Sequence, residues 1–385
     1  MQYYKGNESG QTPGILPGPP PAGDYYWWES GAMWGTLIDY WKLTGDSTYN
    51  DEITKSLLWQ VGPNRDFKPP NVTASLGNDD QAFWGMSAML AAENNFPNPP
   101  KDQPQWLALA QAVFYTQSTP DQHDDTWYVE PTLVLPYFGY SGIANGCFFN
   151  LGARLARYTG NQSYADWAEK TWDWVKGVKL MDDEYNIYDG AHVQTNCTDI
   201  NRAQFSYNNA VYLEGAAYIR HRVRDRVDEG AHVVHGGHAQ ATRATCNRWM
   251  AVATQVAPFL ADKILPVLKK STEAAVSTCT GEANGRTCGF KWNTKAYDGS
   301  HGAGQQMNVL GAVSSLLIAQ SPPPVTNMTG GTSQGDPEAG THSDRNNKKG
   351  DLRPITAGDK AGASILTILV IVSAMGTFGW MSTGV

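Results

Sequence analysis

The chain has 385 residues, with 37 acidic and 29 basic side chains, so its formal net charge is -8. A negative balance argues against a nucleic-acid partner and suits a neutral polysaccharide. The 14 Trp, 18 Tyr and 11 Phe residues are enough to build a sizeable core and also to line a sugar site with rings. The length allows one large domain or two ordinary ones.

Apolar residues recur at helical spacing along most of the chain, whereas strand-like alternation is scarce. In chain order the predicted helices are residues 30–43, 49–60, 80–93, 104–117, 147–158, 164–175, 208–218, 247–268 and 304–319. The long loops at 13–23 and 63–77 are of a length that is more often functional than idle. The pattern predicts an all-α protein.

An internal repeat appears at an offset of 115 residues, where Thr44-Gly45-Asp46 lines up with Thr159-Gly160-Asn161. Each copy has a helix, a glycine stop, a hydroxyl residue and a second helix, which is ordinary helix punctuation. Helical hairpins repeated at a long period indicate a closed or curved array.

The composition changes after residue 319. Residues 321–360 are rich in Pro, Gly and polar residues and are predicted to be a flexible stalk, whereas 361–385 form an apolar tail. Small residues, a polar spacer and a terminal apolar tail are typical of a glycosylphosphatidylinositol (GPI) attachment signal, with a plain tail anchor as the alternative. We expect attachment to a membrane through a GPI anchor.

The beginning of the chain has no pattern of a signal peptide. Even so, five N-glycosylation sequons favour a secreted protein at the cell surface or cell wall; they begin at Asn7, Asn71, Asn161, Asn196 and Asn327.

Five cysteines are present, of which Cys279 and Cys288 are close enough in sequence to bridge. The odd count leaves one thiol unpaired or points to missing partners. No Cys-x-x-Cys pair occurs, and the glycines within His232-x-x-His235-x-x-His238 argue against a helical metal site. We therefore expect neither a metal nor another cofactor.

The adjacent carboxylates Asp79 and Asp80 stand at the start of a predicted helix, downstream of the aromatic run Tyr25-Tyr26-Trp27-Trp28. Two carboxylates that share a site push their pKa values apart, so one is ionised while the other keeps its proton. Retaining glycoside hydrolysis needs one carboxylate as nucleophile and one carboxylic acid as proton donor. The alternative is simple helix capping, since Asn and Asp are common at helix starts.

The string from Leu76 to Met86, together with residues 24–29 and 31–36, resembles glycoside hydrolase family 76, and within it the fungal cell-wall mannan endo-1,6-α-mannosidases that carry a lipid anchor. Further matching stretches are residues 14–21, 145–151, 188–191 and 302–307. The resemblance implies an (α/α)6 barrel with Asp79 as nucleophile and Asp80 as general acid/base. It also implies action on α-1,6-mannan or on the mannose core of GPI glycans, by hydrolysis or by transfer to an acceptor such as β-glucan.

Six further residues are candidates for substrate binding. Trp27 and Trp28 are predicted to stack on sugar rings, with core packing as the alternative. Asn78 and Gln81 are predicted to bond sugar hydroxyls, with helix capping as the alternative. Asn145 and Tyr207 are weaker candidates that rest on the resemblance alone.

Within a predicted catalytic domain of residues 1–320, two segments depart from the family pattern, namely 119–140 and 219–245. The second contains four arginines and a histidine in seven residues, so it has to stay solvated. We interpret both as gene-model errors and expect a poorly stable chain. The alternative functions are a wall-anchored mannan-binding protein without activity and a structural wall glycoprotein.

Overall fold

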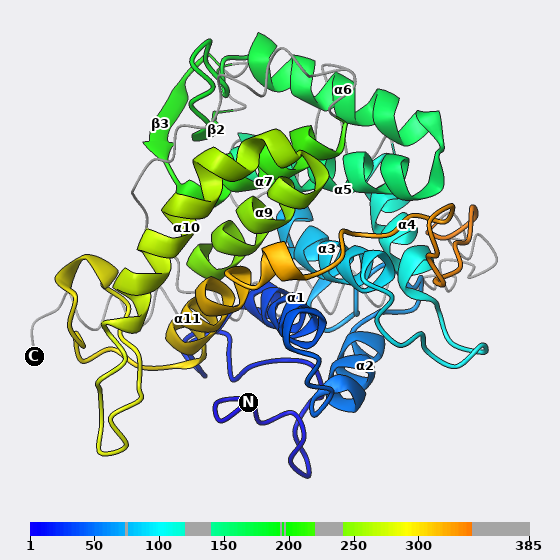
Figure 1. Ribbon diagram of the computed structural model, residues 1–385. Helices are drawn as coiled ribbons and strands as arrows, with labels where there is room; N and C mark the ends of the chain where they lie inside the picture. Colours follow the sequence, from blue (N-terminus) through cyan, green and yellow to red (C-terminus); the bar gives the residue numbers. More distant parts are fainter. Residues whose placement is uncertain (74–75, 120–139, 193–194, 196–197, 220–241, 341–385) are drawn as a thin grey trace, which may run out of the picture. The chain divides into compact units, whose positions relative to one another are not determined.

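Six helices form a closed ring at the centre of the protein (Figure 1). The ring consists of α1 (Trp27–Thr44), α3 (Asn78–Glu93), α5 (Gly142–Thr159), α7 (Ser206–Tyr218), α9 (Thr242–Val256) and α11 (Ala303–Ser315). Each helix packs against the next, and α11 returns to α1. The computed structural model describes residues 1–73, 76–119, 140–192, 195, 198–219 and 242–340. The unit that contains the ring is Met1–Thr341.

In the part of the chain that the structure describes, four more helices lie outside the ring (Figure 1). They are α2 (Asn50–Trp59), α4 (Trp106–Gln117), α6 (Gln162–Gly177) and α10 (Ala261–Val276). Each of the four packs against the inner helix that precedes it in the chain. An inner helix followed by an outer one is the repeating unit of an α/α barrel, so the predicted all-α, (α/α)6 fold is confirmed.

Side-chain contacts show that the inner helices run in the same direction. On α1 and α3, Gly31 lies against Trp84 and Gly35 lies against Ser87, so the contacts advance along both helices in the same order. Ser87 also donates to the carbonyl of Gly31 at 2.8 Å. Likewise, the phenolic oxygen of Tyr25, which precedes α1, accepts from the backbone N–H of Ala303 at the start of α11 at 2.6 Å. Between α5 and α7, Gly142 lies against Asn208 and Phe149 lies against Gly215, again in the same order. Cys246 near the start of α9 donates to the carbonyl of Ser206 at the start of α7, and Glu93 at the end of α3 pairs with Arg154 in the second half of α5. The six inner helices therefore begin at one end of the barrel, which we call the N-terminal end.

The predicted repeat is present as two helical hairpins, α1–α2 and α5–α6. Both inner helices have 18 residues, and both end at a glycine in the left-handed conformation, Gly45 with φ 76° and Gly160 with φ 72°. Glycine adopts this conformation without steric cost, which explains why the Thr-Gly pair marks both helix ends.

Two elements differ from the sequence prediction. The single helix predicted over 247–268 is two helices, because Pro258 lacks an N–H and interrupts the ladder between α9 and α10. A three-stranded antiparallel sheet was also not predicted. It has the order β1 (Tyr140–Ser141), β2 (Tyr188–Ala191), β3 (Ile200–Gln204), and Ser141 of β1 pairs with Gly190. The sheet lies next to the first turn of α5.

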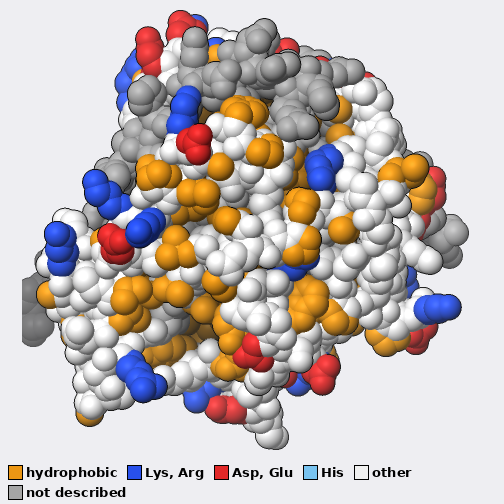
Figure 2. Space-filling model, viewed as in Figure 1, with side chains coloured by type: hydrophobic (Ala, Val, Ile, Leu, Met, Phe, Trp, Pro, Cys, Tyr) orange, Lys and Arg blue, Asp and Glu red, His pale blue; other side chains and the backbone are white. Residues whose placement is uncertain are grey.

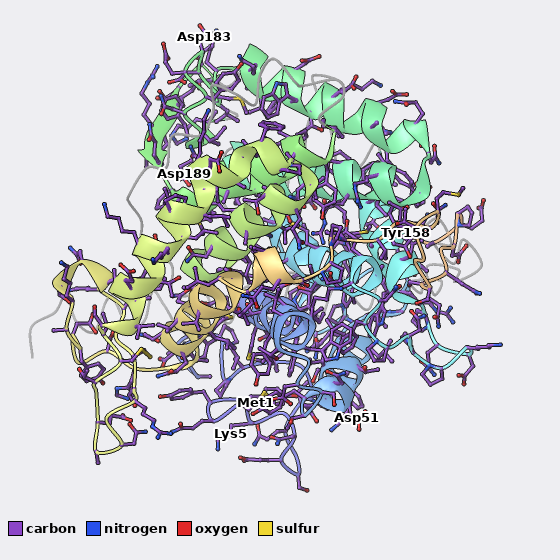
Figure 3. All side chains as sticks on the ribbon, viewed as in Figure 1. Met1, Lys5, Asp51, Tyr158, Asp183 and Asp189 are labelled. Atoms are coloured by element: carbon purple, nitrogen blue, oxygen red, sulfur yellow. A yellow bond between two sulfur atoms is a disulfide. The ribbon has the colours of Figure 1, made fainter. Side chains whose placement is uncertain are left out.

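Residues 321–340, which we call the strap, are not the flexible stalk predicted for this stretch. The backbone N–H of Val325 donates to the carbonyl of Glu93 at 2.8 Å, and that of Asn327 donates to Tyr158 at 3.0 Å. Further along, Ser333 Oγ accepts from the N–H of Leu107 at 2.9 Å. Figure 3 labels Tyr158 beside this segment. The strap therefore crosses from the C-terminal ends of α3 and α5 to the start of α4.

The barrel interior contains buried charged side chains between rings and aliphatic groups. Arg154 on α5 donates to Glu93 on α3 from Nε at 2.9 Å and from Nη2 at 2.6 Å, and both side chains are fully buried. Arg248 on α9 forms a second buried ion pair with Asp39 on α1. A narrow cavity on the barrel axis is lined by both arginines and by Glu214 on α7. By contrast, Figure 2 shows acidic and basic side chains mainly toward the edge of the face it displays.

The predicted disulfide between Cys279 and Cys288 is present, and Cys147 and Cys246 are both buried. The two segments that depart from the family pattern lie mostly outside the described residues, as do the histidine tract, Cys197 and the tail from 341 onward. In the part of the chain that the structure describes, no helix combines the length and apolarity needed to cross a membrane.

Candidate active site

Asp79 and Asp80 lie in the first turn of α3, at the N-terminal end of the barrel. Asp79 Oδ1 accepts from the backbone N–H of Asp80 at 3.0 Å. Asp80 Oδ2 accepts from the N–H of Gly77, the residue that precedes the helix, at 2.7 Å. One oxygen of each carboxylate is thus held by the main chain, and Asp80 also caps the helix. The capping alternative therefore describes part of the role of Asp80.

The surroundings of the pair raise the pKa of both carboxyl groups. Burial raises the pKa of Asp79, while the N–H groups of Asp80 and of Asp79 itself oppose the rise. For Asp80, burial and then the negative charge of Asp79 raise the pKa to about 8. The negative charge of Asp79 therefore opposes the ionisation of Asp80. At neutral pH Asp80 keeps its proton and is able to donate it.

The direction of the inner helices adds a second electrostatic feature. The first turn of a helix carries unpaired N–H groups and a partial positive charge. Because all six inner helices begin at the same end, these partial charges surround the site that contains Asp79. Such a field favours an anion at neutral pH without a cationic side chain.

Two residues from other elements belong to the same site. Tyr207 lies in the first turn of α7, and its pKa is raised by burial and then by the charges of Asp189 and Asp79. Asp189 is on β2, half-buried, and accepts from Asn201 Nδ2 at 3.0 Å. Burial raises the pKa of Asp189. Asp189 on β2 is labelled in Figure 3. The structure thus brings the predicted Tyr207 close to the pair and adds a third carboxylate.

Asp189 was not among the residues predicted from the sequence. The only available signal was its place within the stretch 188–191, which carries the family resemblance. No spacing in the sequence relates a residue on a short strand to the first turn of a helix more than a hundred residues earlier.

Aromatic rings lie one turn below the carboxylate pair. Trp28 packs against Phe83 with ring centroids 4.7 Å apart, and Phe83 stacks on Trp249 at 6.1 Å. Trp27 stacks on Trp84 at 4.7 Å and donates from Nε1 to Gln60 at 2.9 Å. Both predicted tryptophans are half-buried, so each combines core packing with an exposed part.

Three of the predicted substrate-binding residues lie below the surface. Gln81 is 0% exposed and donates from Nε2 to the carbonyl of Asp66 at 2.7 Å, so the structure gives it a position in the core and not beside a sugar. Asn145 is also 0% exposed and donates to the carbonyl of Ser141 at 3.0 Å, and the same correction applies to it. Asn78 is the first residue of α3 and does not cap it. Its Nδ2 has no partner among the described residues.

The side chain of Gln117 fixes the start of α3. Gln117, at the end of α4, donates from Nε2 to the carbonyl of Asn78 at 2.7 Å and to Gln81 Oε1 at 3.0 Å. These bonds hold the backbone that carries Asp79 and Asp80. Among the described residues, no group of three or more His, Cys, Asp or Glu side chains is arranged to hold a metal ion.

The sequence model of glycosyl hydrolase family 76 matches residues 1–226 and 238–328. Mannan endo-1,6-alpha-mannosidase DCW1 of Eremothecium gossypii is 38% identical, over 99% of this chain and 90% of the relative. The crystal structure of Dfg5 from Chaetomium thermophilum, in complex with glucosamine, is 53% identical with a TM-score of 0.84, covering 90% of this chain and 93% of that one.

A more distant solved structure shares the fold. It is an inactive variant of the α-1,6-mannanase GH76A of Salegentibacter sp. HEL1_6, in complex with α-1,6-mannotetrose. It is 14% identical with a TM-score of 0.58, over 77% of this chain and 90% of that one.

A barrel of parallel inner helices with a carboxylate pair at its N-terminal end defines this protein as an α/α-barrel glycoside hydrolase. The extent of the family match and the identity to the fungal relatives carry the assignment further. The chain belongs to glycosyl hydrolase family 76. The match omits residues 227–237, which lie within the second segment that departs from the family pattern.

Proposed function

We propose that this protein is a retaining endo-acting α-1,6-mannosidase. The observation that carries the proposal is the pair of adjacent, buried carboxyl groups in the first turn of α3, each with one oxygen held by a backbone N–H, of which Asp80 keeps its proton at neutral pH. The names of the relatives support the choice of substrate, and the mannanase variant that was made inactive by replacing two consecutive aspartates supports the choice of residues.

In the proposed reaction, Asp79 attacks the anomeric carbon of a mannose residue and forms a glycosyl ester, while Asp80 gives its proton to the departing glycosidic oxygen. Asp80, now ionised, then removes a proton from the incoming hydroxyl group, which attacks the anomeric carbon and releases Asp79. Adjacent residues on a helix point about 100° apart, so the two carboxyl groups approach one sugar from different sides.

The incoming hydroxyl group belongs to water in hydrolysis and to a second sugar in transfer. Both outcomes use the same glycosyl ester, so we propose α-1,6-mannan or the mannose core of GPI glycans as donor and a wall β-glucan as one acceptor. The proposed location is the cell surface or cell wall, with attachment to a membrane through a GPI anchor on the C-terminal tail. The composition of residues 321–385 and the sequons support this location.

The test uses the variants Asp79→Asn and Asp80→Asn with an α-1,6-mannooligosaccharide, with and without a glucan acceptor. We expect both variants to lose turnover by at least about a thousandfold, as removal of a nucleophile or a proton donor does. Thermal melting should stay close to that of the unchanged chain, because Asn can also cap a helix. Asp51→Asn, an exposed change on α2, is the matched control.

Shorter products mean hydrolysis, and longer or hybrid products mean transfer. Near-normal turnover in either variant would refute the assignment of the pair. Binding of the oligosaccharide without turnover by the unchanged chain would favour the alternative of an inactive mannan-binding protein.

A further inference from the structure

Two exposed aromatic side chains lie at the same end of the barrel as the carboxylate pair. Tyr26 immediately precedes α1, and its side chain is 57% exposed. Trp59 is the last residue of α2, and its side chain is 61% exposed. Large aromatic side chains are usually mostly buried, so a Trp exposed to this degree is unusual.

The backbone arrangement shows that the two residues are neighbours. The helix α2 runs antiparallel to α1, so its last residue lies near the first residue of α1. The indole N–H of Trp27 donates to Gln60 Oε1 at 2.9 Å, which joins the residue after Tyr26 to the residue after Trp59. Gln60 is held from the other side, because its Nε2 donates to the carbonyl of Pro13 at 2.7 Å. The bond between Trp27 and Gln60 ties the start of α1 to the end of α2, the two helix ends that carry Tyr26 and Trp59.

Trp27 is half-buried, and it rests on a buried aromatic layer. Trp27 stacks on Trp84 at 4.7 Å, and Trp84 lies 5.7 Å from Phe67, so the layer beneath Tyr26 is itself aromatic. Trp84 belongs to α3, one turn after Asp80. Trp27 therefore stands at the same end of the barrel as the pair, where the exposed rings of Tyr26 and Trp59 also lie.

We propose that Tyr26 and Trp59 form a distal binding site for a chain of hexopyranose units, which we call the rim site. This inference rests on the proposed function, because it takes the sugar chain to be the extension of the α-1,6-mannoside bound at the pair. Aromatic faces suit the apolar C–H face of a hexopyranose, and a neutral sugar has no charge that opposes the net charge of -8.

The rim site predicts that affinity depends on chain length. Covering one ring face removes on the order of 50 Å² of apolar surface from water, which corresponds to about a tenfold gain in affinity. Oligosaccharides that are too short to reach the rim do not have this gain. The binding constants of α-1,6-mannooligosaccharides of two to eight units are therefore measured by calorimetry, in the Asp79→Asn background to prevent turnover.

In the rim variants Tyr26→Ala, Trp59→Ala and Trp59→Leu we expect the affinity for long chains to fall about tenfold, toward that for short ones. Trp59→Phe should keep most of the gain, since it retains a flat ring, whereas Leu retains only apolar volume. Phe259→Ala is the matched control. Phe259 is a 45% exposed aromatic residue that follows α9, at the opposite end of the barrel, and its removal should change no binding constant by more than about twofold.

Several results would overturn the rim site. One is a loss of affinity in the rim variants that is equal at every chain length. Another is a loss of affinity in Phe259→Ala as large as that in the rim variants. Binding of neutral phosphatidylcholine vesicles that the rim variants abolish, with no effect on oligosaccharides, would assign the rings to a lipid surface instead. If the background chain binds short chains and the rim variants match it at all lengths, the rim site is wrong but the proposed function stands. If the Asp79→Asn background chain binds no α-1,6-mannooligosaccharide, the rim site and the proposed function are both wrong.

Discussion

Glu214 allows the electrostatics of the barrel interior to be tested by a single substitution. Its side chain is 1% exposed, and one carboxylate oxygen accepts from Asn150 Nδ2 at 2.7 Å. Burial raises its pKa to about 7, although Arg154 and Asn150 lower it; the charge of Glu93 adds to the rise and that of Arg248 opposes it. Glu214 is therefore mostly protonated in the folded protein at mildly acidic pH.

The raised pKa makes stability depend on pH. A carboxyl group with a pKa of 4.5 in the unfolded chain and about 7 in the fold stabilises the fold fully below pH 4.5. This contribution is lost as the pH rises through about 7. At 1.36 kcal/mol per pKa unit, the loss amounts to about 3 kcal/mol.

The perturbation is Glu214→Gln, which keeps an oxygen for Asn150 but does not titrate. We expect the variant and the unchanged chain to have similar free energies of unfolding at pH 4.5. At pH 8 the variant should be more stable by up to about 3 kcal/mol, because it avoids burying a charge. Urea unfolding at pH 4.5, 6 and 8, followed by Trp fluorescence, measures the difference between the two chains.

Burial also raises the pKa values of Asp80 and Glu29, and these groups make the free energy of unfolding depend on pH in both chains. Subtracting the free energy of the unchanged chain from that of Glu214→Gln cancels this shared dependence. Glu8→Gln, an exposed change near the N-terminus, is the control and should follow the unchanged chain at each pH. A difference between Glu214→Gln and the unchanged chain that is the same at pH 4.5 and at pH 8 would refute the reasoning.

Two further predictions concern charged groups. Asp80 has to donate a proton and its pKa is about 8, so kcat/KM should fall as the pH rises through about 8. A pH profile of kcat/KM that is still rising at pH 9 would contradict the assignment of Asp80 as the acid. Arg154→Met leaves Glu93 buried without its cation, so the free energy of unfolding should drop by about 3–5 kcal/mol in urea titrations, with recovery when Glu93→Gln is added. The control Lys5→Met removes an exposed pair and should cost less than about 0.5 kcal/mol; an equal loss in both variants would contradict the role of burial.

Much of the fold follows from local signals in the sequence. The Thr-Gly stops at 44–45 and 159–160 predicted the ends of two inner helices, because a left-handed glycine is a property of the residue itself. The doublet Asp79-Asp80 was likewise placed at the start of a helix. Pro258 was the available signal for the break between α9 and α10, but the apolar spacing that continues past it concealed the break.

The parts that the sequence did not predict depend on contacts between distant residues. The strands have two, four and five residues, too few for an alternating pattern to appear. The polar composition of residues 321–340 indicated a stalk. That segment is held mostly through its own main-chain N–H and C=O groups, several of them bonded by side chains of the barrel, and composition gives no signal for such bonds. Gln81 and Asn145 were predicted at the sugar because polar side chains near a site suggest ligands, but each bonds a backbone carbonyl in the core.

The strap determines how a mechanical load enters the protein. Beyond Ser333, the backbone N–H of Asp336 in the strap donates to Gln111 on α4 at 2.8 Å. The hydrogen bonds between the strap and the barrel therefore follow one another along the strap. A pull applied to the chain after Gly340 therefore breaks them one at a time, from α4 back toward Val325 at the end of α3. Unzipping of this kind needs far less force than shearing many bonds at once. Loss of the strap's bonds in this order leaves the ring of inner helices closed, because each inner helix contacts its neighbours directly and not through the strap.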